Sequence, residues 1–90
     1  MLIALIARDK PGHLQTRVDN RAAHLAYIEE TGVVAQAGPL LDQDGEMAGS
    51  LVILDIEDMA AGEAWAENDP YNKAGLFEAV ELITWKKVIG

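Results

Sequence analysis

The chain has 90 residues, half of them hydrophobic, which is enough for one domain with a buried core, so we expect a single domain over residues 1–90. With 15 acidic and 7 basic residues its formal net charge is −8, and an acidic chain of this kind is a poor partner for nucleic acid or an anionic membrane. The absence of cysteine excludes a disulfide, a thiolate nucleophile and a thiolate metal site, and it fits a cytoplasmic location.

The first predicted element is a strand from Leu2 to Ala7, part of the longest uninterrupted apolar run in the chain. A membrane span needs about 20 such residues. The run also lacks the basic segment and the small-residue cleavage site of a signal peptide. Pro11 and Gly12 break the extended chain after this strand.

The second element is helical and runs from His13 to Thr31. Asp19 and Asn20 are good N-cap residues, so the pattern permits either one helix or two pieces with a new start at these positions. Gly32 fits the end of the helix, because glycine readily adopts the left-handed backbone conformation that closes one.

Two strands follow, from Val33 to Leu41 and from Leu51 to Ile56, with the turn residues Asp44-Gly45 between them. Gly38-Pro39 interrupts the first of these strands. Because proline has no N–H to donate to a neighbouring strand, we expect an edge position or a bulge there.

The last third of the chain contains a second helix, a short turn and a final strand. Asp58 can cap a helix that reaches Glu67, and Asp69-Pro70 places an aspartate cap before a first-turn proline. The final strand is predicted from Phe77 to Val88. The order β-α-β-β-α-β predicts an α+β, ferredoxin-like layer, in which a four-stranded antiparallel sheet carries helices on one face.

The strands are apolar on both faces, whereas strands of a sheet with one solvent-exposed face alternate apolar and polar residues. Leaving roughly 600 Å² of apolar surface exposed would cost about 15 kcal/mol at about 25 cal/mol per Å². That cost equals or exceeds the stability of a typical domain. We therefore expect an identical subunit to cover the open sheet face and form a homodimer, with another protein as the alternative cover.

Motifs for nucleophilic catalysis and for phosphate-binding glycine loops are missing from the sequence. The only histidines are His13 and His24, and no H-E-x-x-H or similar spacing occurs. We therefore expect neither a metal nor another cofactor. Acid–base chemistry by a histidine is the catalytic possibility that remains.

His24 lies on the predicted helix, at the edge of its apolar stripe. At about 100° per residue, Ala22 and Leu25 fall near the middle of that stripe and Ile28 on its flank. An edge position leaves the imidazole partly buried and reachable, which suits a general base near neutral pH. A rim histidine that only packs and binds water is the alternative, and the helix pattern alone favours it.

Asp69 is explained as a helix cap without any chemistry. A carboxylate held at the start of a turn also keeps one oxygen free to accept a histidine N–H. Such a bond fixes the imidazole tautomer, and the carboxylate stabilises the positively charged ring that forms when the imidazole takes a proton. The spacing between His24 and Asp69 gives no indication that the two side chains meet.

Several short motifs occur in order along essentially the whole chain: Arg8-Asp9-Lys10, Arg21-x-x-His24-Leu25, Ala37-Gly38-Pro39, Gly49-Ser50, Ala64-Trp65-Ala66-x-x-Asp69-Pro70-Tyr71, Ala74-Gly75 and Lys86-Lys87-Val88. Each is weak alone, but together they are specific, and by them the chain resembles YCII-related (YciI-like) proteins. The resemblance implies a dimeric α+β barrel related to muconolactone isomerases and small monooxygenases. It also implies an active site that pairs the motif histidine with the Asp-Pro-Tyr aspartate, here His24 and Asp69.

The resemblance further suggests which side chains bind a substrate. The candidates are Arg21, Gly38, Pro39, Ser50 and Tyr71. Arg21 could hold an anionic substrate group, although a surface ion pair is the commoner fate of an arginine. The others also have structural explanations: Gly38-Pro39 as a strand bulge, Ser50 as a polar residue at the start of a strand, and Tyr71 as a ring packed over the short turn. The stretch from Pro39 to Gly49 is shorter than is typical of the family, which implies a different substrate if that loop covers the pocket.

Two functions from different classes fit these observations. In the first, an isomerase- or lyase-type enzyme uses His24 to move a proton on a small cyclic or unsaturated organic acid or phenol, and Asp69 orients the imidazole. In the second, a non-catalytic dimeric module binds a small ligand or a protein partner in the same cleft. The sequence separates them poorly, because a binding pocket can use the same histidine.

Overall fold

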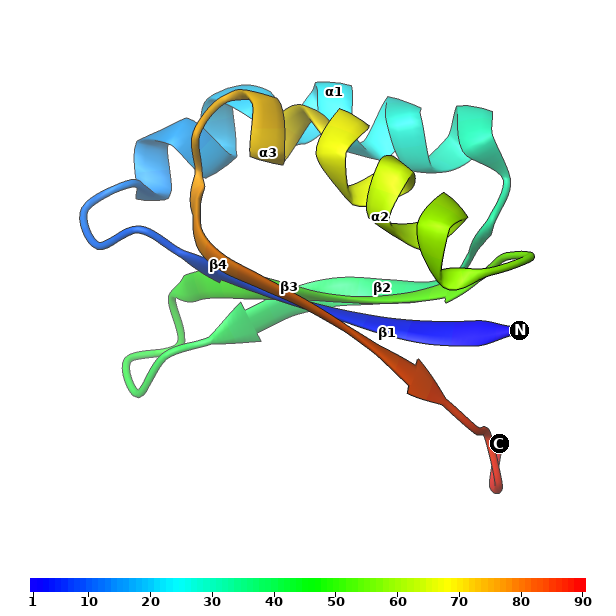
Figure 1. The fold of residues 1–90 in the computed structure, drawn as a ribbon. Helices are drawn as coiled ribbons and strands as arrows, with labels where there is room; N and C mark the ends of the chain where they lie inside the picture. The colour runs from blue at the N-terminus through cyan, green and yellow to red at the C-terminus, as the bar shows by residue number, and fades with distance from the viewer.

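The strands and helices follow one another in the order that the sequence predicts, and the computed structural model describes all of residues 1–90 (Figure 1). The strands are β1 (Leu2–Asp9), β2 (Val34–Leu41), β3 (Met47–Asp55) and β4 (Phe77–Trp85). The helices are α1 (Leu14–Thr31), α2 (Met59–Asn68) and the short α3 (Pro70–Lys73). No helix is both long and apolar enough to cross a membrane.

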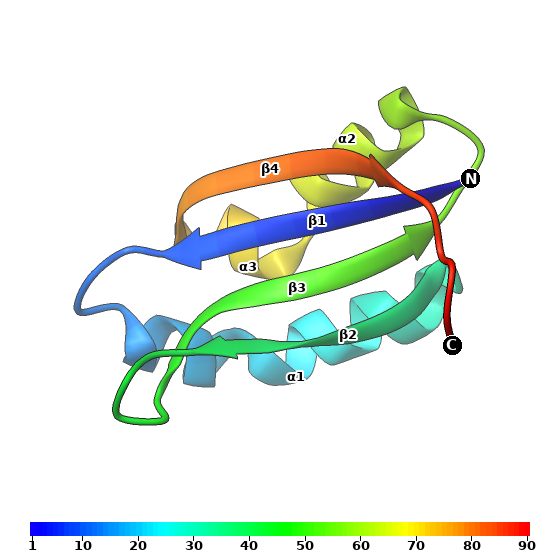
Figure 2. The same ribbon diagram turned by 90° about the horizontal axis from the view of Figure 1, so that it is seen from below.

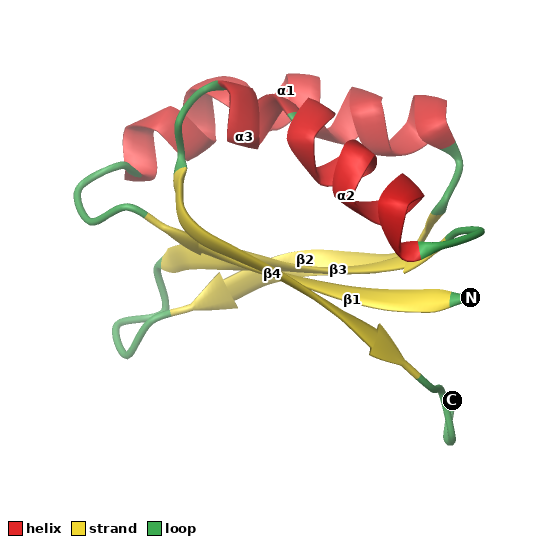
Figure 3. Cartoon of the chain, in the orientation of Figure 1, coloured by secondary structure: helices red, strands yellow, loops and turns green.

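The four strands form one antiparallel sheet in the order β2-β3-β1-β4. All three helices lie on the same face of this sheet, as Figure 3 shows. The prediction of a ferredoxin-like β-α-β-β-α-β layer is therefore confirmed. The two central strands, β1 and β3, come from distant parts of the chain, and the crossovers through α1 and α2 place both helices over them.

The core lies between the helices and the central strands. Strand register places Ile3 opposite Leu54 and Leu5 opposite Val52, so these four side chains share the helix-facing side of the sheet. Trp65 of α2 packs on them and is 5% exposed, as expected of a core residue. Burying one such aliphatic side chain contributes about 1.5–3 kcal/mol, so this layer supplies much of the driving force for folding.

Helix α1 is continuous, and the alternative of a second start at Asp19 and Asn20 is wrong. Both side chains bond within the helix instead of capping a new one. Asp19 accepts a hydrogen bond from Gln15, and the Asn20 amide donates to the carbonyl of Thr16. Side chains that satisfy themselves inside the helix leave no reason for a break.

The predicted helix ends agree with the structure. Gly32 closes α1 with a backbone φ of 65°, and its N–H donates to the carbonyl of Ile28. Asp58 caps α2 by accepting the N–H of Ala61. Asp69 caps α3 by accepting the N–H of Tyr71. These caps fix where the chain turns, and the last of them positions a candidate site residue.

Several details of the predicted strands need correction. β3 begins at Met47 instead of Leu51, because backbone pairing with β1 and β2 continues past Ser50 to Gly49. β4 ends at Trp85 instead of Val88, where pairing with β1 runs out. β2 is an edge strand as expected, but its register shifts lie on either side of Gly38-Pro39 and not at these residues.

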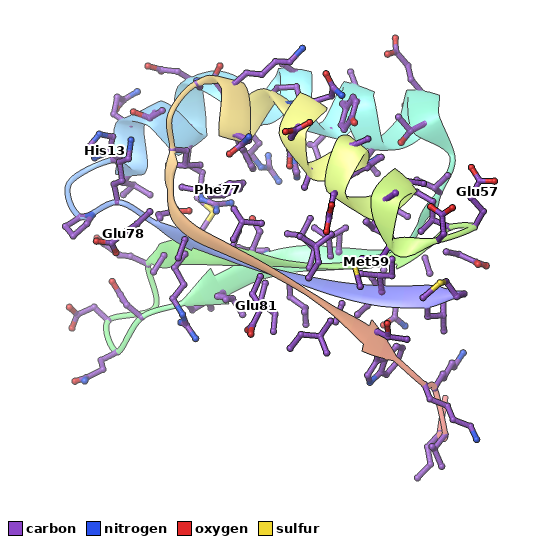
Figure 4. All side chains as sticks on the ribbon, viewed as in Figure 1. His13, Glu57, Met59, Phe77, Glu78 and Glu81 are labelled. Atoms are coloured by element: carbon purple, nitrogen blue, oxygen red, sulfur yellow. The ribbon has the colours of Figure 1, made fainter.

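The second face of the sheet carries no helix, as the view in Figure 2 shows. Leu51, Ile83 and Trp85 lie on it and are between 39 and 46% exposed in the single chain. The polar side chain of Glu81 also points away from the helices (Figure 4). This face is therefore largely apolar and has no cover within the chain beyond the tail that follows β4.

Candidate active site

His24 and Asp69 meet between α1 and the start of α3. The imidazole Nδ1 lies 2.8 Å from Asp69 Oδ1, and both residues are buried, at 6% and 1% exposed. Forty-five positions separate them in the sequence, and the packing of α3 on α1 brings them together. The link between the two residues that the family resemblance implied is therefore present in the geometry of the fold.

The Asp69 carboxylate is held by its cap position. The same oxygen, Oδ1, accepts the N–H of Tyr71 at 3.0 Å and the bond from His24. The sequence interpretation had assigned the cap and the histidine to different oxygens, so that detail is wrong. The cap bond from the Tyr71 N–H holds this oxygen in place, so the imidazole meets an acceptor of fixed position.

The second imidazole nitrogen, Nε2, makes no hydrogen bond within the chain, yet no fully buried polar side-chain atom lacks a partner. Nε2 is therefore reached by solvent. When the Asp69 carboxylate is ionised it can only accept, so the neutral imidazole then carries its hydrogen on Nδ1 and exposes the Nε2 lone pair. An imidazole in this arrangement can act as a base through Nε2, because the Asp69 carboxylate at Nδ1 fixes its tautomer.

The ring of Tyr71 supports the imidazole from the side. The two rings stack with centroids 3.9 Å apart and planes 14° from parallel. Phe77 meets Tyr71 edge-on at 6.0 Å, and the Arg17 guanidinium lies over the Tyr71 ring at 4.7 Å from its centroid. Stacking and cation–π contacts each contribute about 0.5–2 kcal/mol, so Tyr71 is held between charged and aromatic neighbours.

Arg17 also belongs to this site, although it is not among the residues predicted from the sequence, and it is 2% exposed. Its Nε donates to Asp9 Oδ2 at 2.7 Å, and its Nη2 donates to Asp9 Oδ1 at 2.8 Å and to Ser50 Oγ at 2.9 Å. The signal was available: positions 17, 21 and 24 are spaced i, i+4, i+7 and so share one helix face. Polar residues with that spacing mark the side of α1 that faces the site.

Correspondingly, the buried stripe of α1 was misplaced. Ala22 is exposed and Leu25 is 47% exposed, while Arg17 and His24 are the buried residues of this helix. The apolar periodicity predicts a different buried face, because the side of α1 that packs on the sheet and α3 carries the polar residues Arg17 and His24. Their hydrogen-bond partners there are Asp9, Ser50 and Asp69. Pattern reasoning assigns such residues to the outside by default.

A cavity of about 180 Å³ opens beside these groups. It is lined by Arg17, Arg21, His24, Leu25, Ile28, Ala37, Gly38, Pro39, Met47, Ser50, Val52 and Tyr71. All five candidates for substrate binding are among the lining residues, and Asp69 lies behind His24. Within the short stretch from Pro39 to Gly49, Pro39 and Met47 line the cavity, whereas residues 40–46 do not.

Burial and neighbouring charges shift the pKa values of Arg17, Tyr27 and Tyr71. Burial raises the pKa of the Tyr71 phenol, against the opposing charge and hydrogen bonding of Arg17. Burial also raises the pKa of Tyr27, and the negative charge of Asp69 adds to it. Burial alone would lower the pKa of Arg17, but its bonds to Asp9 and the charge of that carboxylate outweigh this effect and raise it. Neither phenol is therefore a base at neutral pH.

The second histidine lies apart from this cavity. His13 is in the loop before α1, where Figure 4 shows it at the outer end of the helix layer, and its Nδ1 bonds to the carbonyl of Pro11. No group of three or more His, Asp or Glu side chains is close enough together to hold a metal ion.

Comparison with known proteins gives a consistent match over the whole length. The YCII-related domain matches residues 1–86. Protein YciI of Escherichia coli O6:H1 is 37% identical over 97 residues, covering 98% of this chain and 99% of that protein, and an uncharacterised protein of Haemophilus influenzae is 31% identical with the same coverage. Among solved structures, 5-chloro-2-hydroxyhydroquinone dehydrochlorinase (TftG) from Burkholderia phenoliruptrix AC1100, in complex with 2,5-dihydroxybenzoquinone, is 41% identical with a TM-score of 0.87. The match covers 96% of this chain and 94% of TftG.

Proposed function

Since the chain belongs to the YCII-related domain family, and resembles one dehydrochlorinase over nearly its whole length, we propose that it is a small-molecule enzyme of the lyase or isomerase type. In this proposal His24 moves protons on a six-membered ring that carries hydroxyl groups, and Asp69 orients the imidazole. No cofactor is required. A cytoplasmic location stays a prediction of the cysteine-free sequence.

The observation that carries the proposal is the pairing of His24 with Asp69 at the wall of the cavity. A base needs a free lone pair, a fixed tautomer and space for a substrate beside it. The solvent-reached Nε2, the 2.8 Å bond from Nδ1 and the 180 Å³ cavity supply these three requirements. An apolar cavity of about 150 Å³ holds benzene, so the space suits a single substituted ring.

Loss of hydrogen chloride from a chlorinated hydroquinone requires only proton transfers. Nε2 takes a proton from one ring hydroxyl and returns it to the carbon that bears chlorine, which gives a ketone tautomer. Chloride then leaves with the C–Cl bonding electrons as a second hydroxyl loses its proton to Nε2 and becomes a carbonyl. The net loss is one proton and one chloride, so no oxidant is consumed, and one base beside a buried carboxylate is sufficient.

Arg21 supports an anionic substrate group. It is exposed, it lines the cavity, and it forms none of the ion pairs in the chain. On a protein with a net charge of −8, an unpaired guanidinium at a cavity attracts a phenolate or carboxylate that other parts of the surface repel. We expect Arg21 to act on substrate binding more than on the proton transfer itself.

The proposal includes a homodimer formed through the open sheet face. Leu51, Ile83 and Trp85 on that face are partly exposed in the single chain, and no helix covers them. A contiguous apolar face of this kind is rare on a monomer. Sedimentation at micromolar concentration tests this part separately, since a well-folded single subunit would contradict it.

The catalytic proposal is tested by incubating the protein with 5-chloro-2-hydroxyhydroquinone and measuring chloride release. We expect turnover by the wild type and a loss of about 10²- to 10⁴-fold in His24→Gln, the usual contribution of a general base. His13→Gln is the matched control, because it removes the other histidine outside the cavity, and it should retain activity.

The carboxylate has its own matched control. Asp69→Asn removes the charge behind His24, and Asp58→Asn makes the same change at the cap of α2, which has no histidine beside it. We expect turnover to fall in the first variant only. Equal activity in His24→Gln and the wild type would contradict the proposal. Binding of the ring compound without turnover would favour the non-catalytic module instead.

A further inference from the structure

Ser50 lines the cavity and is 4% exposed. In β3 it pairs with Ala7 on one side and Pro39 on the other, and register turns it to the helix-facing side with the core residues. Its hydroxyl oxygen accepts a hydrogen bond from Arg17 Nη2 at 2.9 Å. Pairing of β3 with β1 and β2 and the hydrogen bond from Arg17 therefore fix the position of this oxygen.

The hydrogen of the Ser50 hydroxyl has no acceptor within the chain. Arginine has donors only, so the hydroxyl cannot return a bond to Arg17, and Ser50 Oγ makes no other hydrogen bond. Both Nη2 hydrogens of Arg17 are occupied, one by Asp9 and one by Ser50, which keeps the guanidinium from turning away. Because Ser50 lines the cavity, an oxygen of a bound ligand can supply the acceptor that the chain does not.

We propose that Ser50 donates a hydrogen bond to a carbonyl or phenolate oxygen of the ring bound in the cavity, with Arg17 and Asp9 as the positioning pair that aims it. This inference rests on the proposed function and specifies the substrate class. The ring must present an acceptor oxygen at the Ser50 end of the cavity. A ring with an ammonium group there is rejected, because two donors would face each other.

The arrangement also suits the chemistry. As a ring hydroxyl loses its proton, negative charge develops on oxygen, and a donor already polarised by a guanidinium stabilises it without reorganising. The Asp9 carboxylate offsets the charge of Arg17, so the pair remains stable when the cavity is empty. Ser50 and His24 then contact the ring at different points, one stabilising oxygen charge and the other exchanging the proton.

The test is a titration of 2,5-dihydroxybenzoquinone as a probe, followed by absorbance or calorimetry. We expect Ser50→Ala to raise the Kd about tenfold, which corresponds to one hydrogen bond to an ionised or carbonyl oxygen. Ser50→Cys is a second variant in case Ser50→Ala folds poorly. It keeps a side chain of similar volume, but a thiol is a weak hydrogen-bond donor, so we expect it to raise the Kd as well. Thr84→Val removes a hydroxyl from β4, which does not line the cavity, and should leave the Kd unchanged.

A double-mutant cycle separates positioning from simple stability. If Arg17 acts through the Ser50 hydroxyl, Arg17→Lys raises the Kd in the wild-type background and adds nothing in the Ser50→Ala background. Additive effects would overturn the positioning role. A Kd unchanged in both Ser50→Ala and Ser50→Cys would overturn the inference and leave the catalytic proposal for His24 intact. Failure of the wild type to bind the probe would overturn both for rings of this class.

Discussion

The imidazole of His24 and the phenol ring of Tyr71 lie face to face, with their centroids 3.9 Å apart. This stack adds to the Asp69 bond a second contact that restricts rotation of the imidazole. The imidazole is therefore held by a hydrogen bond at one edge and by an aromatic surface on one face, and its Nε2 makes no hydrogen bond within the chain.

Replacing Tyr71 tests the stack. Tyr71→Phe keeps the ring and should preserve the upfield ring-current shift of the His24 side-chain protons in NMR spectra. Tyr71→Leu removes the aromatic surface and should abolish that shift and reduce stability by about 1–3 kcal/mol, since the residue is 2% exposed. An upfield shift that persists in Tyr71→Leu would show that the rings do not stack.

The buried pair of Arg17 and Asp9 should be costly to break. Asp9→Asn leaves a guanidinium without its carboxylate at a 2% exposed position, and we expect a loss of about 3–5 kcal/mol in denaturant unfolding. Asp19→Asn, which affects only an exposed bond from Gln15, should change stability by less than about 0.5 kcal/mol. Similar losses in the two variants would mean that the buried pair contributes little.

Gly49 allows β1 to approach the strand that carries Ser50. A side-chain carbon at this position would collide with the backbone carbonyl of Ala7, so Gly49→Ala should destabilise the protein by about 3 kcal/mol and displace Ser50. Gly38→Ala is the control, because an added carbon there meets nothing within 4 Å. Thermal unfolding of both variants checks this, and equal midpoints would contradict the steric account.

The two tyrosines predict a loss of stability at alkaline pH. The pKa values of Tyr27 and Tyr71 are raised above their ordinary value of 10.0, chiefly by burial. Above pH 10 the unfolded chain loses these protons while the folded chain retains them, so the free energy of unfolding falls as pH rises, and below pH 10 the tyrosines contribute no slope. Tyr71→Phe should make the alkaline decline shallower in urea titrations, and an unchanged slope would argue against it.

The sequence predicted the order of elements and the helix ends well, because those signals are local. Gly32, Asp58 and Asp69 act on backbone groups within a few residues, so capping chemistry is readable from neighbouring positions. Strand limits were less accurate. The extension of β3 to Met47 depends on pairing with distant strands, which no local pattern encodes.

Only part of the candidate site could be predicted from the sequence. His24 and Asp69 came from the family resemblance, since their meeting depends on the packing of α3 on α1. Arg17 was missed because an arginine is expected at the surface, and its burial depends on Asp9, eight positions earlier, and on Ser50, thirty-three positions later. Buried polar residues whose partners lie elsewhere in the chain are the ones that periodicity places on the wrong side.

A long-range ¹H–¹⁵N correlation spectrum of His24 tests directly whether Asp69 sets the tautomer of the imidazole. With the ring neutral, we expect a protonated Nδ1 and an unprotonated Nε2 in the wild type. In Asp69→Ala this tautomer preference should be lost, and it should survive in Asp58→Ala, with the His13 signals unchanged as an internal reference. A wild-type His24 protonated at Nε2, or the same Nδ1–H tautomer in Asp69→Ala, would contradict this expectation.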